Sequence, residues 1–190
     1  MTKKLLGHKM HLRKKFNLHA NKSKVTAGNL NLWIKNKKSL TNRIKGIASL
    51  KIKLITNKRN IFLMSEKQFF SSYRPETLFL REVIIFANDD PIMYARTVLP
   101  YKYLRSHWAE IKNLKTNSLS EVVYDKPCIK RSNFSYLPSS LNNNIIKKIH
   151  LYGLETKKLE IGRQSHFKYK KENILLTEFF FAALDKFDFQ

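Results

Sequence analysis

Leu78-Phe79-Leu80-Arg81-Glu82-Val83-Ile84-Ile85-Phe86-Ala87 is the clearest indication of the fold, together with the four residues after it, Asn88-Asp89-Asp90-Pro91. The first ten residues are rich in Leu, Val, Ile and Phe, and this composition favours a buried strand. The next four tolerate turn dihedrals, and proline belongs at a turn or a strand start because it cannot donate to a ladder. A second apolar run, Ile92–Leu99, follows the turn. The whole stretch therefore predicts a β-hairpin.

The C-terminal third of the chain shows the same organisation. Leu159–Tyr169 and Ile174–Leu184 flank the polar residues Lys170-Lys171-Glu172-Asn173, which predicts a second hairpin. We expect further strands at residues 49–56 and 61–64, a turn at 57–60, short helices at 40–45, 103–111 and 119–124, and a polar loop at 138–148. Long strands joined by tight turns, with helices grouped between them, indicate an α+β fold. The expected architecture is a single domain with an antiparallel sheet of about six strands.

The composition sets limits on the class of protein. The chain has 190 residues, 43% of them hydrophobic, which suits one globular domain with a packed core. Its one cysteine, Cys128, excludes an internal disulfide and fits a reducing compartment. The longest apolar stretch, residues 174–184, is too short to span a bilayer, and no secretory signal is visible. We expect a monomer without a transmembrane segment.

The positive charge is concentrated in the N-terminal third. The net charge is +23, and no acidic residue precedes Glu66, whereas residues 1–65 hold 17 Lys and Arg. One interpretation is a cationic arm for RNA, DNA or an anionic membrane. The other is the bias of translated AT-rich DNA, which the 16 Asn also indicate. The second is favoured because no nucleic-acid-binding motif accompanies the charge. We therefore expect a basic arm over residues 1–27, a domain over 28–190, and no nucleic-acid partner.

Two charged residues stand on apolar faces of the predicted strands. Side chains alternate across a strand, so Arg81 shares a face with Phe79, Val83 and Ile85, and Glu178 shares one with Leu176 and Phe180. A buried guanidinium needs an anion, and a buried carboxylate needs a cation or a raised pKa. Either the two residues pair with each other, or with neighbours such as Arg96 and Glu82, for folding alone, or they line a ligand cavity. The polarity pattern alone favours the structural interpretation.

Other chemistries find no support in the sequence. The six His are scattered without metal-ligand spacing, the five Gly form no phosphate-binding loop, and there is no Gly-x-Ser-x-Gly motif. We expect neither a metal nor a cofactor.

Three motifs in chain order resemble the chorismate–pyruvate lyase family. Leu80-Arg81-Glu82 followed by Ala95-Arg96-Thr97-Val98-Leu99-Pro100 resembles its Leu-Arg-Glu and Gly-Arg-Thr-Val-x-Pro strands. Ile161-Gly162-Arg163-Gln164-Ser165 and Leu175-Leu176-Thr177-Glu178-Phe179-Phe180 resemble its Gly-Arg-Arg-Ser strand and its closing Leu-Leu-Thr-Glu-x-Phe strand. Ser39-Leu40-Thr41-Asn42-Arg43 is similar to a Ser-Met-Thr segment that closes over the site. Together the motifs cover about residues 30–184.

The resemblance implies an α+β domain whose helical flaps enclose an internal ligand cavity. It implies the conversion of chorismate to 4-hydroxybenzoate and pyruvate, a carbon–oxygen lyase reaction that needs no cofactor. Arg81 would hold the ring carboxylate, and Glu178 would face the oxygen-bearing end of the ring and assist proton transfer. Main-chain groups of Leu40 and Leu119 would close on the ligand. Arg96, in the strand that resembles Gly-Arg-Thr-Val-x-Pro, is also expected to bind substrate.

The sequence departs from the family pattern at two positions. Its location and alternative functions also remain open at this point. Ala95 replaces a Gly, and Leu40 stands where Met is common. The AT-rich composition resembles the plastid-encoded algal branch of the family, which implies the plastid stroma and a role of 4-hydroxybenzoate as a quinone precursor. The alternative location is a bacterial cytoplasm. The alternative functions are a sensor-like pocket that binds a small aromatic acid without catalysis and, with less support, a basic RNA-associated protein.

Overall fold

The computed structural model describes residues 28–59, 66, 69–70, 72–74, 77–124, 126–138, 143–154 and 159–189. The predicted arm at residues 1–27 and the predicted strand at 61–64 lie outside these ranges.

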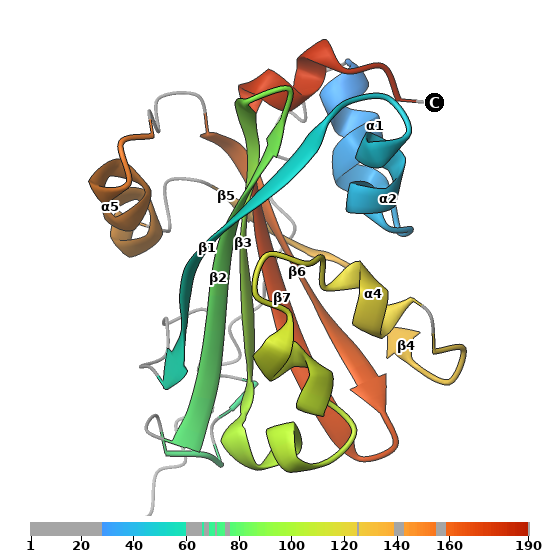
Figure 1. The fold of residues 1–190 in the computed structure, drawn as a ribbon, viewed down its shortest axis with the longest axis vertical. Coiled ribbons are helices and arrows are strands. Elements are labelled where there is room, and N and C mark those ends of the chain that lie inside the picture. The colour runs from blue at the N-terminus through green and yellow to red at the C-terminus, as the bar shows by residue number, and fades with distance from the viewer. Residues whose placement is uncertain are drawn as a thin grey trace, which may run out of the picture.

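One antiparallel sheet of seven strands forms the framework of the molecule (Figure 1). The strands are β1 (Leu50–Arg59), β2 (Leu78–Ala87), β3 (Asp90–Pro100), β4 (Lys130–Arg131), β5 (Ser135–Pro138), β6 (Leu159–Tyr169) and β7 (Glu172–Phe181). Their order is β1-β2-β3-β7-β6-β4, and β5 also pairs with β6. The α+β class and the antiparallel sheet are confirmed, with seven strands in place of about six.

Both predicted hairpins are present, and their turns are tighter than expected. The β2–β3 turn has positive φ at Asn88 (47°) and Asp89 (65°), so both of its central residues adopt the left-handed geometry that matches the twist of the strands. The β6–β7 turn consists of Lys170 and Lys171, with Lys170 at φ 51°. Each turn therefore has two residues instead of the predicted four, which changes the pairing of the strands.

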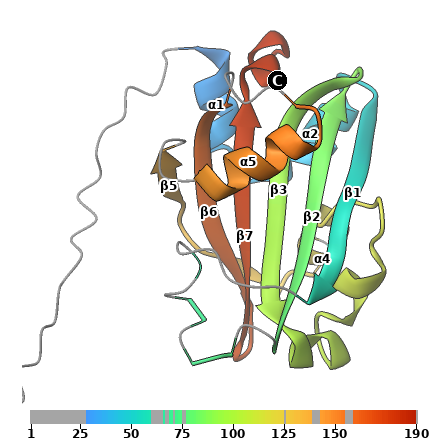
Figure 2. The same cartoon turned by 90° about the vertical axis from the view of Figure 1, so that its left-hand side faces the viewer.

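Helices cover both faces of the sheet (Figures 1 and 2). Helices α1 (Asn29–Lys35), α2 (Leu40–Lys45) and α4 (Ser120–Val123) and the 3₁₀ helices η2 (Tyr101–Arg105) and η3 (Ala109–Asn113) lie on one face, and α5 (Asn143–Leu151) crosses the other. A 3₁₀ helix, η6 (Ala182–Lys186), follows β7. The larger core, with Trp33 and Trp108 fully buried, fills the first face, and a smaller core packs Ile145 and Ile149 of α5 against Tyr94 and Phe179.

Local signals explain where several elements begin and end. Ser39 caps α2, because its hydroxyl accepts a hydrogen bond from the backbone N–H of Asn42 at 3.1 Å. A glycine after a helix is expected to adopt a left-handed conformation, but Gly46 ends this helix in a right-handed one (φ −77°), so that expectation is wrong here.

Three other local predictions are also corrected. The predicted turn at 57–59 is part of β1, the predicted helix at 103–111 is two 3₁₀ helices, and the predicted polar loop at 138–148 contains the start of α5. In the described part of the chain, no helix has the length and apolar character needed to cross a membrane.

Candidate active site

A cavity lies between the larger-core face of the sheet and the segments that cover it. Its floor comes from β1, β2, β3, β6 and β7, and its cover comes from residues 38–41, residues 117–120, Val123, Tyr124 and Arg131. Four of the five predicted site residues, Leu40, Arg81, Leu119 and Glu178, line this cavity, and so does Ala95.

The register of the sheet sets where the two charged residues stand on the cavity floor. Arg81 lies opposite Thr97, and Glu178 lies opposite Ala95, which is two residues before Thr97 on β3. With strands about 4.8 Å apart and about 3.3 Å of rise per residue, their Cα atoms are about 12 Å apart. Arg81 and Glu178 therefore mark two ends of one cavity and do not pair with each other, so that structural interpretation is wrong.

Arg81 is a buried cation whose hydrogen bonds go to uncharged groups. Its side chain is 2% exposed, and its Nη2 donates to the carbonyl oxygens of Lys115 (3.1 Å) and Asn117 (2.6 Å). Its Nε is buried and has no hydrogen-bond partner. Burial lowers the pKa of Arg81 to about 10, and the charge of Glu121 opposes this shift. The group is still charged at neutral pH, so an anion in the cavity would satisfy it.

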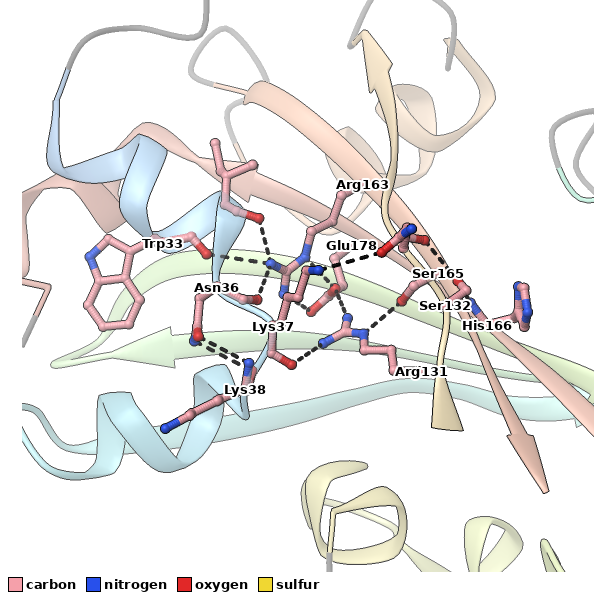
Figure 3. Close-up of polar contacts among 12 residues, drawn as sticks. Trp33, Asn36, Lys37, Lys38, Arg131, Ser132, Arg163, Ser165, His166 and Glu178 are labelled. Carbon is pink, nitrogen blue, oxygen red and sulfur yellow. Dashed lines mark hydrogen bonds and ion pairs between the residues drawn. The ribbon is translucent and has the colours of Figure 1, made fainter. Parts of the chain in front are cut away.

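Glu178 carries two guanidinium partners (Figure 3). Arg163 holds it in a fork, with Nε–Oε2 at 2.6 Å and Nη2–Oε1 at 3.0 Å, and Arg131 Nη2 lies 2.9 Å from Oε2. Burial alone would raise the pKa of the carboxyl, but the two guanidinium charges lower it below its ordinary value. Glu178 is therefore an ionised carboxylate at the far end of the cavity.

Arg163 connects this carboxylate to the end of α1. The residue is fully buried, and its Nη1 donates to the carbonyl oxygens of Ile34 (2.6 Å) and Asn36 (2.8 Å). The last carbonyl groups of a helix have no partner within the helix, so a buried guanidinium satisfies them well. Sequence reasoning assigned no role to Arg163, although its place in the Gly-Arg motif strand was a usable signal.

Arg131 is the second site residue that sequence reasoning missed. Its Nε donates to the hydroxyl of Ser165 (2.9 Å) and its Nη1 to the hydroxyl of Tyr124 (2.7 Å). Its guanidinium lies over the rings of Phe134 and Phe167, 4.5 and 4.9 Å from their centroids. These contacts hold a charged group in place at the edge of the cavity.

A cluster of hydroxyl groups joins the two segments that cover the cavity. Thr41 Oγ1 of α2 lies 2.7 Å from Ser118 Oγ and 3.0 Å from Ser120 Oγ, and the two serine oxygens are 2.8 Å apart. The neighbours Leu40 and Leu119 line the cavity. The cluster therefore holds these two predicted ligand-closing residues over the same space.

Arg96 lies on the opposite face of the sheet, so the prediction that it binds substrate in this cavity is corrected. It forms ion pairs with Glu66 and with Glu82 (Nη1–Oε1, 2.6 Å), and the hydroxyl of Tyr94 also donates to Glu82. Side chains alternate along β3, so Ala95 and Thr97 face the cavity and the residue between them faces away.

The cavity can thus hold a small anion at Arg81 and present an ionised carboxylate and a guanidinium at its other end. Among the residues that the structure describes, no three or more His, Cys, Asp or Glu side chains gather in a way that could hold a metal ion.

Comparisons with known proteins identify a matching family and a similar fold. The family model described as "Chorismate lyase" matches residues 13–187. The chain is 29% identical over 153 residues to a "Probable chorismate pyruvate-lyase" of Hydrogenovibrio crunogenus, with 80% of each chain covered. It is 24% identical over 160 residues to a protein of the same name from Nitrosospira multiformis, with 80% of this chain and 86% of the other covered. Among solved structures it is similar to PhnF from Mycobacterium smegmatis, with a TM-score of 0.51, 12% identity, and 78% of this chain and 65% of the other covered. The last likeness concerns the fold alone.

Proposed function

Because this chain belongs to the chorismate lyase family, we propose that it converts chorismate to 4-hydroxybenzoate and pyruvate. The observation that carries the proposal is Arg81, a buried guanidinium in the cavity whose Nε has no partner. Leaving such a charge without an anion costs several kcal/mol, on the order of 3–5 for a broken buried pair. A ring carboxylate would remove that cost through charge-assisted hydrogen bonds.

The proposed reaction is an elimination that makes the ring aromatic. The bond between ring carbon C3 and the ether oxygen breaks, and the proton at C4 leaves. The enolpyruvate takes up a proton at its methylene carbon and becomes pyruvate, while the C4 hydroxyl stays on the product. Glu178 is ionised and lies at the far end from Arg81, so it faces the C4 side of the ring and accepts the proton there.

The chain contributes mainly by holding the substrate in a reactive pose. The lowered pKa of Glu178 makes it a weak base, so its part in catalysis is about the 10²–10⁴-fold typical of one general base, or less. The aromatic product supplies the driving force. The cavity supplies orientation and excludes water, since Arg81 and Glu178 are each less than 5% exposed.

Incubation of the purified protein with chorismate tests the proposal, with 4-hydroxybenzoate and pyruvate followed by chromatography. We expect the unchanged protein to release the two products in equal amounts. The Arg81→Ala variant should not bind 4-hydroxybenzoate, and the Glu178→Gln variant should bind it normally but turn over chorismate slowly. Arg105→Ala, a change at an exposed arginine, is the control and should behave like the unchanged protein. Full activity of both site variants would contradict the assignment of the site.

A second candidate function is non-catalytic binding of a small aromatic acid. The specific observation in its favour is that Arg163 and Arg131 already satisfy Glu178, which suits a stable binding group as well as a base. Tight binding of 4-hydroxybenzoate without turnover of chorismate would favour this function over the lyase reaction.

The proposed setting is quinone biosynthesis in a plastid stroma, and a bacterial cytoplasm is the alternative. The support is the composition, with 37 Lys and Arg against 14 Asp and Glu and abundant Asn, as translated AT-rich DNA would give. The genes that flank the coding sequence would decide between a plastid and a bacterial chromosome.

A further inference from the structure

We propose that Arg131 binds the second carboxylate of the substrate, the one on the enolpyruvyl group. This inference rests on the proposed function and goes beyond it, because it makes the cavity selective for a dicarboxylate over the monocarboxylate product. Chorismate carries one carboxylate on the ring and one on the enolpyruvyl ether. Arg81 accounts for the first, and the second needs its own cation.

The charges that line the cavity match a dianion. Apart from the exposed Lys38, the charged side chains of the lining are Arg81, Arg131, Arg163 and Glu178, three positive charges and one negative. Their sum is +2, which the two carboxylates of chorismate would neutralise and the single carboxylate of 4-hydroxybenzoate would not. Glu178 cancels one of the two guanidinium charges at the far end, so one positive charge remains there for the ligand.

Arg131, and not Arg163, is placed to use that remaining charge. Arg163 is 0% exposed, and it is occupied by Glu178 and the carbonyl groups at the end of α1. Arg131 has a side chain 11% exposed at the edge of the cavity. Its Nη2 donates one hydrogen bond, to Glu178, and carries a second N–H. One of its Nη1 contacts is the long 3.4 Å approach to the carbonyl oxygen of Lys37, which a ligand carboxylate would improve on.

The surroundings of Arg131 hold its guanidinium in a fixed orientation before the ligand arrives. The hydroxyl of Ser165 accepts a hydrogen bond from its Nε–H at 2.9 Å (Figure 3), and the guanidinium lies over the rings of Phe134 and Phe167. A fixed planar fork binds a carboxylate with little loss of side-chain entropy. Because Arg131 also contacts Glu178, the departing enolpyruvate would lie next to the group that takes the ring proton.

The position also assists departure of the leaving group. As the C3–O bond breaks, negative charge develops on the enolate oxygen, a few bonds from the carboxylate that Arg131 holds. A guanidinium fixed at that end stabilises the developing charge without reorganisation. Arg131 therefore contributes to substrate selection and to the elimination itself.

Binding of two non-reacting ligands to the full chain, measured by titration calorimetry, tests the proposal. One is 4-hydroxybenzoate. The other is 3-(1-carboxyethoxy)-4-hydroxybenzoate, in which a saturated ether replaces the enolpyruvyl group and keeps its carboxylate. Arg131→Gln should weaken the dicarboxylate about 10- to 150-fold, as expected for the loss of a charge-assisted hydrogen bond, and change 4-hydroxybenzoate binding by less than about threefold. KM for chorismate should rise in parallel. Arg105→Gln, at an exposed arginine, is the matched control and should change neither ligand.

Each other outcome has a defined meaning. Equal weakening of both ligands would show that Arg131 only positions Glu178, and unchanged dicarboxylate binding would assign the second carboxylate elsewhere; either result overturns the proposal. If Arg131→Gln does not fold, Arg131→Lys carries the test, because it keeps the charge and loses the planar fork. It should weaken the dicarboxylate alone. Failure of the unchanged protein to bind 4-hydroxybenzoate would instead contradict the proposed function. The titration with 4-hydroxybenzoate tests that point separately from the role of Arg131.

Discussion

Replacement of Arg163 by methionine is the sharpest test of the structural argument. Methionine keeps much of the volume and removes the charge and all donors. The change takes the bidentate partner from Glu178 and leaves the carbonyl groups of Ile34 and Asn36 without their shared donor. Both consequences fall on buried groups, since Glu178 is 4% exposed and Asn36 is 9% exposed.

The expected cost is large for a single substitution. Removal of one partner from a buried ion pair costs about 3–5 kcal/mol, because the other charge stays buried. Arg131 still contacts Glu178 at 2.9 Å, so the lower half of that range is expected. A change of 1 kcal/mol shifts the melting temperature of a chain of this size by about 2–4 °C, which gives a fall of roughly 6–16 °C.

Urea denaturation followed by circular dichroism measures the change in the free energy of unfolding. Arg105→Met makes the same chemical change at an exposed position and should stay within about 0.5 kcal/mol of the unchanged protein. In the double variant with Glu178→Met neither member of the bidentate pair is left buried without the other, so its loss should be smaller than the sum of the single losses by about 0.5–3 kcal/mol. A loss under about 1 kcal/mol for Arg163→Met, or additive losses in the double variant, would show that the Arg163–Glu178 ion pair does not stabilise the fold.

The pH dependence gives a second measure of the same interaction. The pKa of Glu178 is lowered in the folded protein from an ordinary value of 4.5. A lowered carboxyl pKa contributes stability that is present above the unfolded value and is lost as the pH falls through the folded value. The difference in stability between the unchanged protein and Arg163→Met should therefore narrow below about pH 4.5. A difference that stays constant from pH 7 to pH 3 would contradict this account.

Three further predictions follow from local geometry. Gly162→Ala should cost about 1–3 kcal/mol in urea denaturation, because a Cβ there would lie 2.6 Å from the buried ring of Phe179; an unchanged midpoint would contradict this. Asp89→Gly should raise the stability by about 0.5 kcal/mol, because residue 89 has φ 65°, and a lowered melting temperature would argue against it. Thr41→Val keeps the side-chain volume but breaks the hydroxyl cluster, so it should lower the free energy of unfolding by about 1 kcal/mol. It should also speed the release of 4-hydroxybenzoate, which stopped-flow experiments measure. An unchanged release rate would show that the cluster does not hold the cover closed.

The correct parts of the fold prediction rest on patterns among residues that are close together in the sequence. Leu78–Ala87 and Leu159–Tyr169 are strands with the predicted bounds, because apolar runs and turn residues are local signals. Residues 57–59 were predicted to form a turn, but they extend β1, because Asn57 pairs with Arg81 on the neighbouring strand. That pairing is a long-range contact, which no local pattern contains.

The turn length decided which residues meet in the site. A four-residue turn at 170–173 would place Ser165 opposite Glu178, whereas the actual two-residue turn places Arg163 there. Because side chains in a sheet are paired by register, a change of two residues exchanged the hydroxyl for the guanidinium that binds the carboxylate. The motif that contains Arg163 could be recognised in the sequence, but the sequence did not show that Arg163 pairs with Glu178.

The α+β class, the two hairpins and the positions of Arg81 and Glu178 on apolar faces could be predicted from the order of the residues, because alternation along a strand is a property of the chain alone. The folded chain was needed to place the two residues at opposite ends of one cavity and to place Arg96 on the other face of the sheet. It also brought in Arg131, from the short strand β4 in a segment without a clear pattern. The physical reason is that a charge is assigned its partner by strand register and by the packing of distant segments, and both are settled only when the whole sheet closes over its core.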